Sequence, residues 1–154
     1  KGMMPGIGEP VFEKLDANLA KAVMSIGAVK GVEIGDGFAS AESFGSSNND
    51  AFCLDQDKHI TKATNHAGGI LGGISDGSDV ILRAAVKPTP SIAKTQQTVN
   101  RDKEPIAIEI GGRHDPIIVP RAVVVVEAMT AITVFDMMME SMSSNLDRIK
   151  RFFS

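Results

Sequence analysis

Apolar residues recur at helical spacing in two long segments, one near each end of the chain. The first covers residues 10–26, where Pro10 suits a first helical turn and Gly27 suits a helix end. Its apolar stripe consists of Phe12, Leu15, Leu19, Ala22, Val23 and Ile26. The second segment runs from about Pro120 to Ser143 and is rich in valine and methionine. The pattern therefore predicts a long helix at each end.

Between these helices the pattern changes to short strand-like runs broken by glycine and polar turns. The predicted strands are residues 29–34, 38–44, 52–54, 59–62, 79–86 and 106–110. Strands in the middle with helices at the ends predict an α+β sandwich, because two helices are too few for a doubly wound parallel sheet. The chain's own helices can cover one face of such a sheet, so a second half or a partner subunit is expected on the other. Residues 1–154 form one portion, with 145–154 as an exposed tail.

Composition narrows the class of protein. Of 154 residues, 43% are hydrophobic and 23% charged, which favours a packed core over disorder. A net charge of −3 and the absence of Trp and Tyr argue against a nucleic-acid binder. No charge-free apolar run reaches eighteen residues, so no membrane span or membrane partner is expected. The single cysteine, Cys53, cannot form an internal disulfide and is expected to be a small core residue in a reducing compartment.

Glycines cluster in several loops, most densely in the run GGILGG at residues 68–73. Paired glycines can serve close packing of strands, or they can let backbone N–H groups approach a phosphate or a flat ring. Neither GxGxxG nor a loop ending in Gly-Lys-Ser/Thr is present. Both interpretations stay open from spacing alone.

Two polar segments could carry chemistry. The KPTPS turn at 87–91 combines a cation and two hydroxyls on a stiff backbone, which suits an anionic group, although an ordinary solvated turn fits equally well. The run Arg113-His114-Asp115 follows a predicted strand. An arginine can bind phosphate or carboxylate and an aspartate can act as a base, while the alternative is a surface ion pair.

The histidines and the cysteine add one candidate site residue. His59 lies in a charged turn and is expected to be solvated, whereas His66 adjoins the glycine loop and could line a site. Three histidines and one cysteine without ligand spacing predict no metal site.

Five segments in this order resemble the C-terminal half of the chorismate synthase family. They are GIGEPVFEKLDANLAKAVMSI at 6–26, AVKGVEIGDGF at 28–38, TNHAGGILGGIS at 64–75, KPTPSI at 87–92, and GRHDP with VPRAV and VEAM within 112–129. The resemblance extends from Gly6 to about Met142. Any one segment would be weak, but five in register are highly specific.

The resemblance implies a lyase of the shikimate pathway, which supplies aromatic amino acid biosynthesis. Such an enzyme converts 5-enolpyruvylshikimate 3-phosphate to chorismate and phosphate by 1,4-anti elimination and requires reduced FMN. The family's fold is a β-α-β sandwich with helices between antiparallel sheets. Members are cytoplasmic flavoproteins that usually assemble as homotetramers.

The resemblance also implies roles for individual residues. Asp115 matches the family aspartate proposed to act as a base near N(5) of the reduced flavin, and Arg113 is expected to reach both the flavin and the anionic substrate. At Gly27 the family often has Asn or Pro, so a side-chain contribution is lost there. The expected FMN contacts are Gly27, Ala28, Gly72, Lys87, Pro88, Thr89, Pro90, Ser91 and Arg113.

The family's two catalytic histidines belong to an N-terminal half that these residues do not include, and neither His66 nor His114 replaces them. The resemblance therefore predicts that the 154 residues alone bind ligands without turnover. The alternative from another class is a non-catalytic flavin- or phosphate-binding fragment that acts in subunit assembly.

Overall fold

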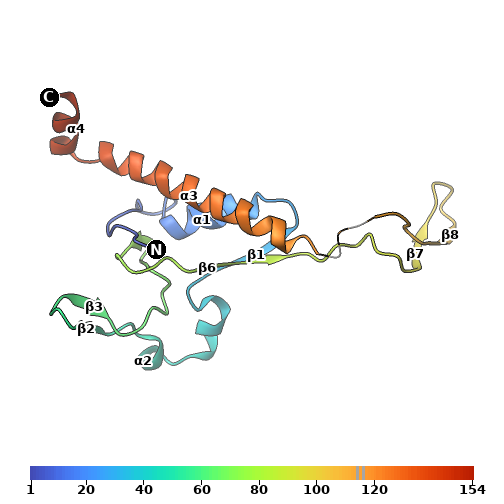
Figure 1. Ribbon diagram of the computed structural model, residues 1–154, viewed down its shortest axis with the longest axis horizontal. Coiled ribbons are helices and arrows are strands. Elements are labelled where there is room, and N and C mark those ends of the chain that lie inside the picture. The colour runs from blue at the N-terminus through green and yellow to red at the C-terminus, as the bar shows by residue number, and fades with distance from the viewer. Residues whose placement is uncertain (114, 116) are drawn as a thin grey trace.

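The computed structural model describes residues 1–113, 115 and 117–154 (Figure 1). The helices are α1 (Leu15–Met24), the 3-10 helix η1 (Gly37–Glu42), α2 (Gly45–Asn48), α3 (Val119–Ser143) and α4 (Leu146–Phe153). The strands are β1 (Val29–Ile34), β2 (Phe52–Leu54), β3 (Ile60–Lys62), β4 (Ile70–Leu71), β5 (Ile74–Ser75), β6 (Leu82–Val86), β7 (Gln96–Val99) and β8 (Pro105–Ile108).

The described strands pair as four separate two-stranded antiparallel sheets, β1–β6, β2–β3, β4–β5 and β7–β8. Three of these are local hairpins, whereas β1 and β6 are far apart in the sequence. Their pairing runs from Val29 opposite Val86 to Ile34 opposite Leu82. Helices and antiparallel strands in one chain confirm the α+β class.

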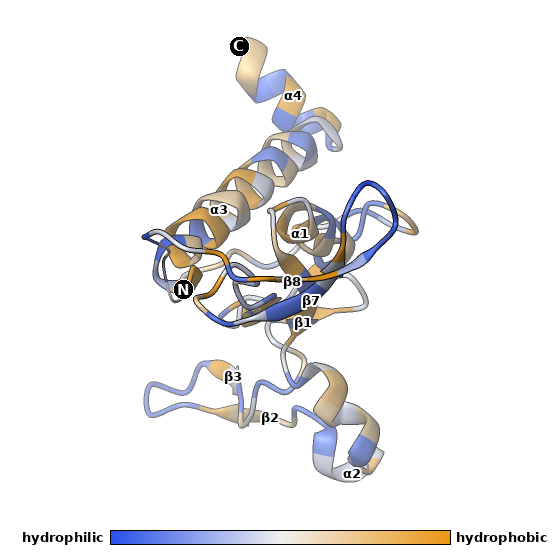
Figure 2. Cartoon of the chain, turned by 90° about the vertical axis from the view of Figure 1, so that its right-hand side faces the viewer, coloured by the Kyte–Doolittle hydropathy of each residue, from blue (hydrophilic) through white to orange (hydrophobic). Residues whose placement is uncertain are grey.

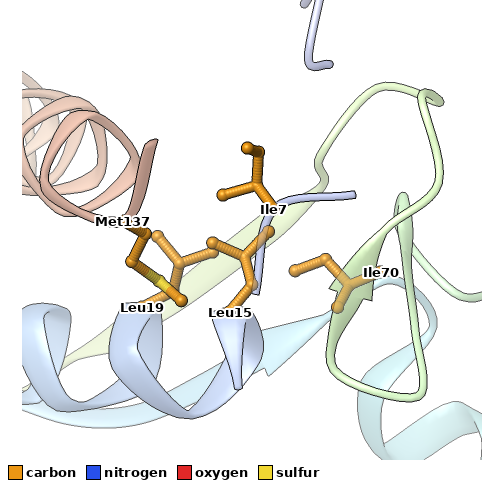
Figure 3. Packing of buried hydrophobic residues seen from close by; sticks show 5 residues of the cluster. All are labelled: Ile7, Leu15, Leu19, Ile70 and Met137. Carbon is orange, nitrogen blue, oxygen red and sulfur yellow. The ribbon is translucent and has the colours of Figure 1, made fainter. Parts of the chain in front are cut away.

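A small buried cluster joins the two ends of the chain. Ile7, Leu15, Leu19, Ile70 and Met137 form it, from the N-terminal segment, α1, β4 and α3 (Figure 3). Burying each such side chain is worth about 1.5–3 kcal/mol relative to leaving it in water. This cluster therefore fixes α3 across α1 and holds the β4–β5 hairpin against the start of α1.

Helix α1 forms where the predicted stripe places its apolar residues. Leu15, Leu19 and Val23 recur four apart and are fully buried. The Leu15 N–H, which has no partner inside the helix, donates to the carbonyl of Gly73 at 2.8 Å. The helix predicted over 10–26 therefore begins five residues later than expected. At its first residue, the carbonyl of Gly73 accepts the hydrogen bond that a preceding helical turn would otherwise accept.

Residues 38–44 were predicted as a strand and instead form η1 and the turn that follows it. Phe38 and Phe44 are exposed, at 79% and 83%, and residues 38–44 pair with none of the described strands. The Phe38 N–H donates to the Glu33 carboxylate at 3.0 Å, which turns the chain away from β1. Alternating apolar residues do not form a strand without a partner edge.

The prediction that Cys53 is a core residue is wrong. Cys53 lies in β2 and is exposed, because the β2–β3 hairpin projects away from α1 and α3 (Figure 1). The hairpin itself was predicted correctly at 52–54 and 59–62. Strand β7 was missed, since its QQTV sequence carries no apolar run.

Helix α3 is predominantly apolar (Figure 2), yet few of its residues are buried. Met137 and Ser141 are its buried residues, while Val124 and Phe135 are 66% and 63% exposed. By length and composition α3 could cross a membrane, with 6% of that stretch buried. This test allows up to two charged residues in the stretch, whereas the expectation from the sequence concerned a charge-free run. Core helices of soluble proteins meet the same criteria.

The accessible surface of the chain is also larger than that of a compact monomer. The accessible surface is 11357 Å², whereas a compact monomer of this mass exposes about 7,500 Å². An apolar groove of about 770 Å³ runs between α3 and β6, lined by Met3, Leu82, Val86, Val123, Val126 and Val134, among others. The described residues thus present an uncovered apolar face, the feature for which the sequence analysis expects a second half or a partner subunit.

Replacing Leu19 by Ala tests the importance of the buried cluster. We expect the free energy of unfolding to fall by about 2–5 kcal/mol, because the substitution removes transfer energy and leaves a cavity. Urea denaturation followed by circular dichroism measures this loss. The control Leu54→Ala, at a side chain 65% exposed, should change stability by less than about 0.5 kcal/mol. Equal losses for both variants would contradict the assignment of the core.

Candidate functional site

One hollow gathers several of the predicted site residues. It has a volume of about 410 Å³ and is lined by Ala28, Lys30, Lys87, Pro88, Thr89, Pro90 and Ile118. The β1–β6 pairing creates it, since residues 28–30 enter β1 at the same end at which residues 87–90 leave β6. The Lys87 N–H donates to the Ala28 carbonyl at 2.7 Å and closes this end of the ladder. Five residues predicted from the sequence therefore lie around one space.

The backbone beside the hollow is strained. Ala28 has φ of 70°, in the left-handed region, where a residue with a Cβ is disfavoured by about 1–2 kcal/mol. Gly27, its neighbour, has open space around the position of a Cβ. The strain turns the chain from the end of α1 into β1 and sets the Ala28 methyl group at the hollow.

The Thr89 hydroxyl is buried in this turn. Within the part of the chain that the structure describes, its Oγ1 has no hydrogen-bond partner. A buried polar group in this state costs about 1–3 kcal/mol, so such groups point to a strained or ligand-binding site. The turn at 87–90 thus combines three exposed residues with one buried hydroxyl group, which makes Thr89 a candidate ligand contact.

Sequence reasoning missed Lys30. It lies at a β-bulge, since Val29 pairs with Val86 and Gly31 pairs with the next residue, Ala85. An extra residue on one strand redirects a side chain and is frequent beside functional sites. No local pattern predicts a bulge, because it depends on the partner strand.

The catalytic candidates lie on the segment that leads into α3. Asp115 forms an ion pair with Arg121 of α3, at 2.8 Å between Oδ2 and Nη1, and its side chain is 44% exposed. Arg113 forms no ion pair with any described residue. His114 and Pro116, which belong to the same motif, lie outside the described residues. Ile118, three residues after Asp115, lines the hollow.

The glycine loop separates into packing and turn positions. A Cβ at Gly68 would lie 2.3 Å from the Gly35 nitrogen, and one at Gly69 would lie 2.6 Å from the Asp79 carbonyl oxygen. Gly72 and Gly73 form the two-residue turn between β4 and β5, with φ of 62° and 89°. Gly72 has open space at its Cβ position. Close packing thus explains much of the GGILGG run.

Gly72 lies apart from the hollow. Its neighbour Gly73 contacts the start of α1 through Leu15, while Ala28 follows the end of that helix. Gly27, Gly72, Ser91 and Arg113 are the expected FMN contacts that do not line the hollow in the described structure.

His66 lies at the far end of β1 from the hollow. Its Nδ1 is 2.7 Å from Oδ2 of Asp36, which also accepts from the Asn48 side chain at 3.1 Å. These contacts tie the loop before β4 to the end of β1. His59 pairs with Asp55 and is 77% exposed, which confirms that it is solvated.

Asp50 fastens the same loop. It accepts hydrogen bonds from the Thr64 hydroxyl and from the backbone N–H groups of His66 and Ala67, at 2.7–2.9 Å. Burial alone would raise the pKa of Asp50, but these donors outweigh it and lower the pKa below its ordinary value of 3.8. The carboxylate is therefore a structural anchor in its ionised form.

The residues around the hollow fit an anionic cofactor of the flavin mononucleotide type. Two ammonium groups and an unpartnered buried hydroxyl suit a phosphate, while Pro88, Pro90 and Ile118 offer apolar surface to a ring system. Among the described residues, no cluster of three or more His, Cys, Asp or Glu side chains could hold a metal ion.

Fold and site together define an α+β protein with a hollow, lined by two lysines, at the end of a long-range strand pair. Residues 1–139 match the family model described as chorismate synthase. The chain belongs to the chorismate synthase family.

Individual relatives agree with this assignment. The chain is 62% identical to chorismate synthase of Lachnospira eligens over 152 residues, which are 99% of this chain and 41% of that protein. It is 59% identical over 136 residues to chorismate synthase of Methanocaldococcus jannaschii, covering 88% of this chain and 36% of that protein. The chain thus spans about two-fifths of the length of these curated relatives.

A solved structure shares the fold. It is titled "Crystal Structure of Chorismate Synthase" and aligns with a TM-score of 0.67 at 31% identity, over 99% of this chain and 38% of the other. The resemblance predicted from five sequence segments is confirmed.

Acid should weaken the anchor at Asp50. Because its folded-state pKa lies below the unfolded value of 3.8, its contribution to stability is present above about pH 4 and is lost as pH falls through and below that value. We expect Asp50→Asn to lose stability at about pH 6 and to show a smaller further loss toward about pH 3 than the parent chain. Urea denaturation across this range measures it, with the exposed Asp102→Asn as control. Parallel pH profiles of the parent and Asp50→Asn would contradict the assignment.

Replacing Thr89 by Val should affect stability and binding in opposite directions. Removing a buried hydroxyl without a partner should stabilise the free chain by about 1 kcal/mol, while the affinity for FMN should fall about fivefold to tenfold because a donor is lost. Thermal denaturation and flavin fluorescence titration measure the two effects. Thr89→Ser keeps the hydroxyl and should retain binding. A less stable Thr89→Val chain with unchanged affinity would exclude the site.

Proposed function

We infer that this chain is the flavin-contacting portion of an enzyme that converts 5-enolpyruvylshikimate 3-phosphate to chorismate and phosphate by 1,4-anti elimination. The observation that carries the proposal is the hollow. It joins Ala28 to the Lys87–Pro90 turn, which the family resemblance assigned to FMN, around a buried Thr89 hydroxyl without a partner.

The chemistry of the residues suits the substrates of this reaction. Reduced FMN, when bound, supplies electron density transiently as the phosphate leaves. Lys87 offsets negative charge at the hollow and Arg113, which has no ion-pair partner among the described residues, is available to a phosphate or carboxylate. Asp115 is assigned to accept a proton at its carboxylate, and its ion pair with Arg121 holds that carboxylate in position.

The apolar face of α3 and the groove beside β6 support the proposal that these residues work with a further layer of protein. Relatives are more than twice as long, and the surface of this chain is about half as large again as that of a compact monomer. We assign the uncovered face to the remaining part of the enzyme, with assembly as a homotetramer in the cytoplasm. This arrangement would supply the histidines and the further cations.

Chorismate formation under anaerobic conditions tests the assignment. The 154-residue chain, given reduced FMN and 5-enolpyruvylshikimate 3-phosphate, should give no turnover. The same chain fused behind the part of the Lachnospira eligens enzyme that it does not match should give turnover. Activity of the chain alone would disprove the need for the remaining part, and an inactive but folded and flavin-binding fusion would favour the non-catalytic assembly fragment.

Asp115→Asn in the active fusion tests the proposed base. We expect turnover to fall at least about a hundredfold, since general acid–base groups contribute about 10²–10⁴, with the affinity for FMN changed less than about threefold. Asp147→Asn, which alters an exposed aspartate in α4, should leave turnover unchanged. Normal turnover of the Asp115→Asn fusion would exclude the base role.

A further inference from the structure

Lys30 and Lys87 extend from opposite strands toward the same hollow. Lys87 follows β6, and Lys30 lies at the bulge of β1. In a regular ladder each β1 residue would face one β6 residue, whereas here Lys30 is the extra residue between two consecutive pairs. The bulge thus brings a second lysine to the hollow.

Neither lysine forms an ion pair with a described residue. The ion pairs of the described residues involve His59, Lys62, His66, Arg83 and Arg121 as the basic partners, and neither Lys30 nor Lys87 is among them. The other lining residues are apolar apart from Thr89. Two ammonium groups at one hollow without a carboxylate favour an anion that contacts both.

The charge balance favours a phosphate monoester. Near neutral pH such a group carries about −1.5 to −2 charges and three strong acceptor oxygens, which two lysines balance. A single carboxylate would leave one ammonium group without a counter-charge. The buried Thr89 hydroxyl provides a third donor, and it is an observation independent of the lysines.

We propose that Lys30 is a phosphate-binding residue, which together with Lys87 and the Thr89 hydroxyl holds the phosphate monoester of FMN or of the substrate. This rests on the proposed function for the identity of the ligand, and it adds a residue that neither the motifs nor the resemblance assigned. The bulge is therefore a specificity element, since it places the second positive charge.

Titration of the 154-residue chain with FMN and with riboflavin, which lacks the phosphate, tests the proposal through flavin fluorescence. Calorimetry with 5-enolpyruvylshikimate 3-phosphate tests the substrate as the alternative source of the phosphate. We expect the parent chain to bind FMN more tightly than riboflavin. Lys30→Gln should weaken FMN binding at least about tenfold, because a charge-assisted hydrogen bond to the phosphate is lost, and should leave riboflavin binding unchanged.

Two further variants separate the role of the charge from an effect on folding. Lys30→Arg keeps the charge and should recover most of the FMN affinity. Lys150→Gln removes the same charge from exposed α4 and should bind FMN like the parent chain. Thermal denaturation should show the same unfolding temperature for Lys30→Gln and Lys30→Arg.

The other possible results show whether the role of Lys30 or the flavin assignment is wrong. If Lys30→Gln left the affinity for both flavins unchanged while FMN was bound, the role of Lys30 would be overturned and flavin binding would stand. If neither flavin bound but the phosphorylated substrate did, with a tenfold loss in Lys30→Gln, the phosphate site would stand and the flavin assignment would fail. Absence of binding by all three ligands would overturn the inference.

Discussion

The pairing of β1 with β6 is the constraint on which the candidate site depends. These strands are more than forty-five residues apart in the sequence, and their antiparallel register sets Ala28 and Lys30 beside the Lys87–Pro90 turn. Every other sheet among the described residues is a local hairpin. A slip of one residue in this register would move each β6 side chain to the opposite face of the sheet. The hollow and the bulge beside it therefore form only in the observed register.

The same arrangement separates residues that maintain the fold from residues available for chemistry. Asp50, Asp36 and His66 tie loops at the far end of β1 and have their partners within the described chain. Lys30, Lys87 and the Thr89 hydroxyl lie at the near end and have none there. Polar groups without partners at one end of a well-connected strand pair are the reason that we propose the ligand site at that end.

The sequence pattern predicted the elements that depend on residues close to one another in the chain. The apolar stripe of α1, the valine- and methionine-rich α3 and the β2–β3 hairpin follow from periodicity and turn residues. Three features depend on distant partners and were not predictable: the late start of α1 against Gly73, η1 in place of a strand, and the bulge at Lys30. The family resemblance supplied most of the site residues, whereas the pairing of Asp115 with Arg121 and the role of Lys30 needed the three-dimensional arrangement.

The central claim is that the hollow between β1 and the turn after β6 binds FMN, and methyl NMR tests it most directly. With alanine and threonine methyl groups labelled, titration with FMN should shift the Ala28 and Thr89 signals in a saturable manner. The signals of Ala41 in η1 and Thr61 in β3, which lie outside the hollow, should stay constant. Unmoved Ala28 and Thr89 signals under saturating FMN, or shifts confined to other methyl groups, would contradict the account.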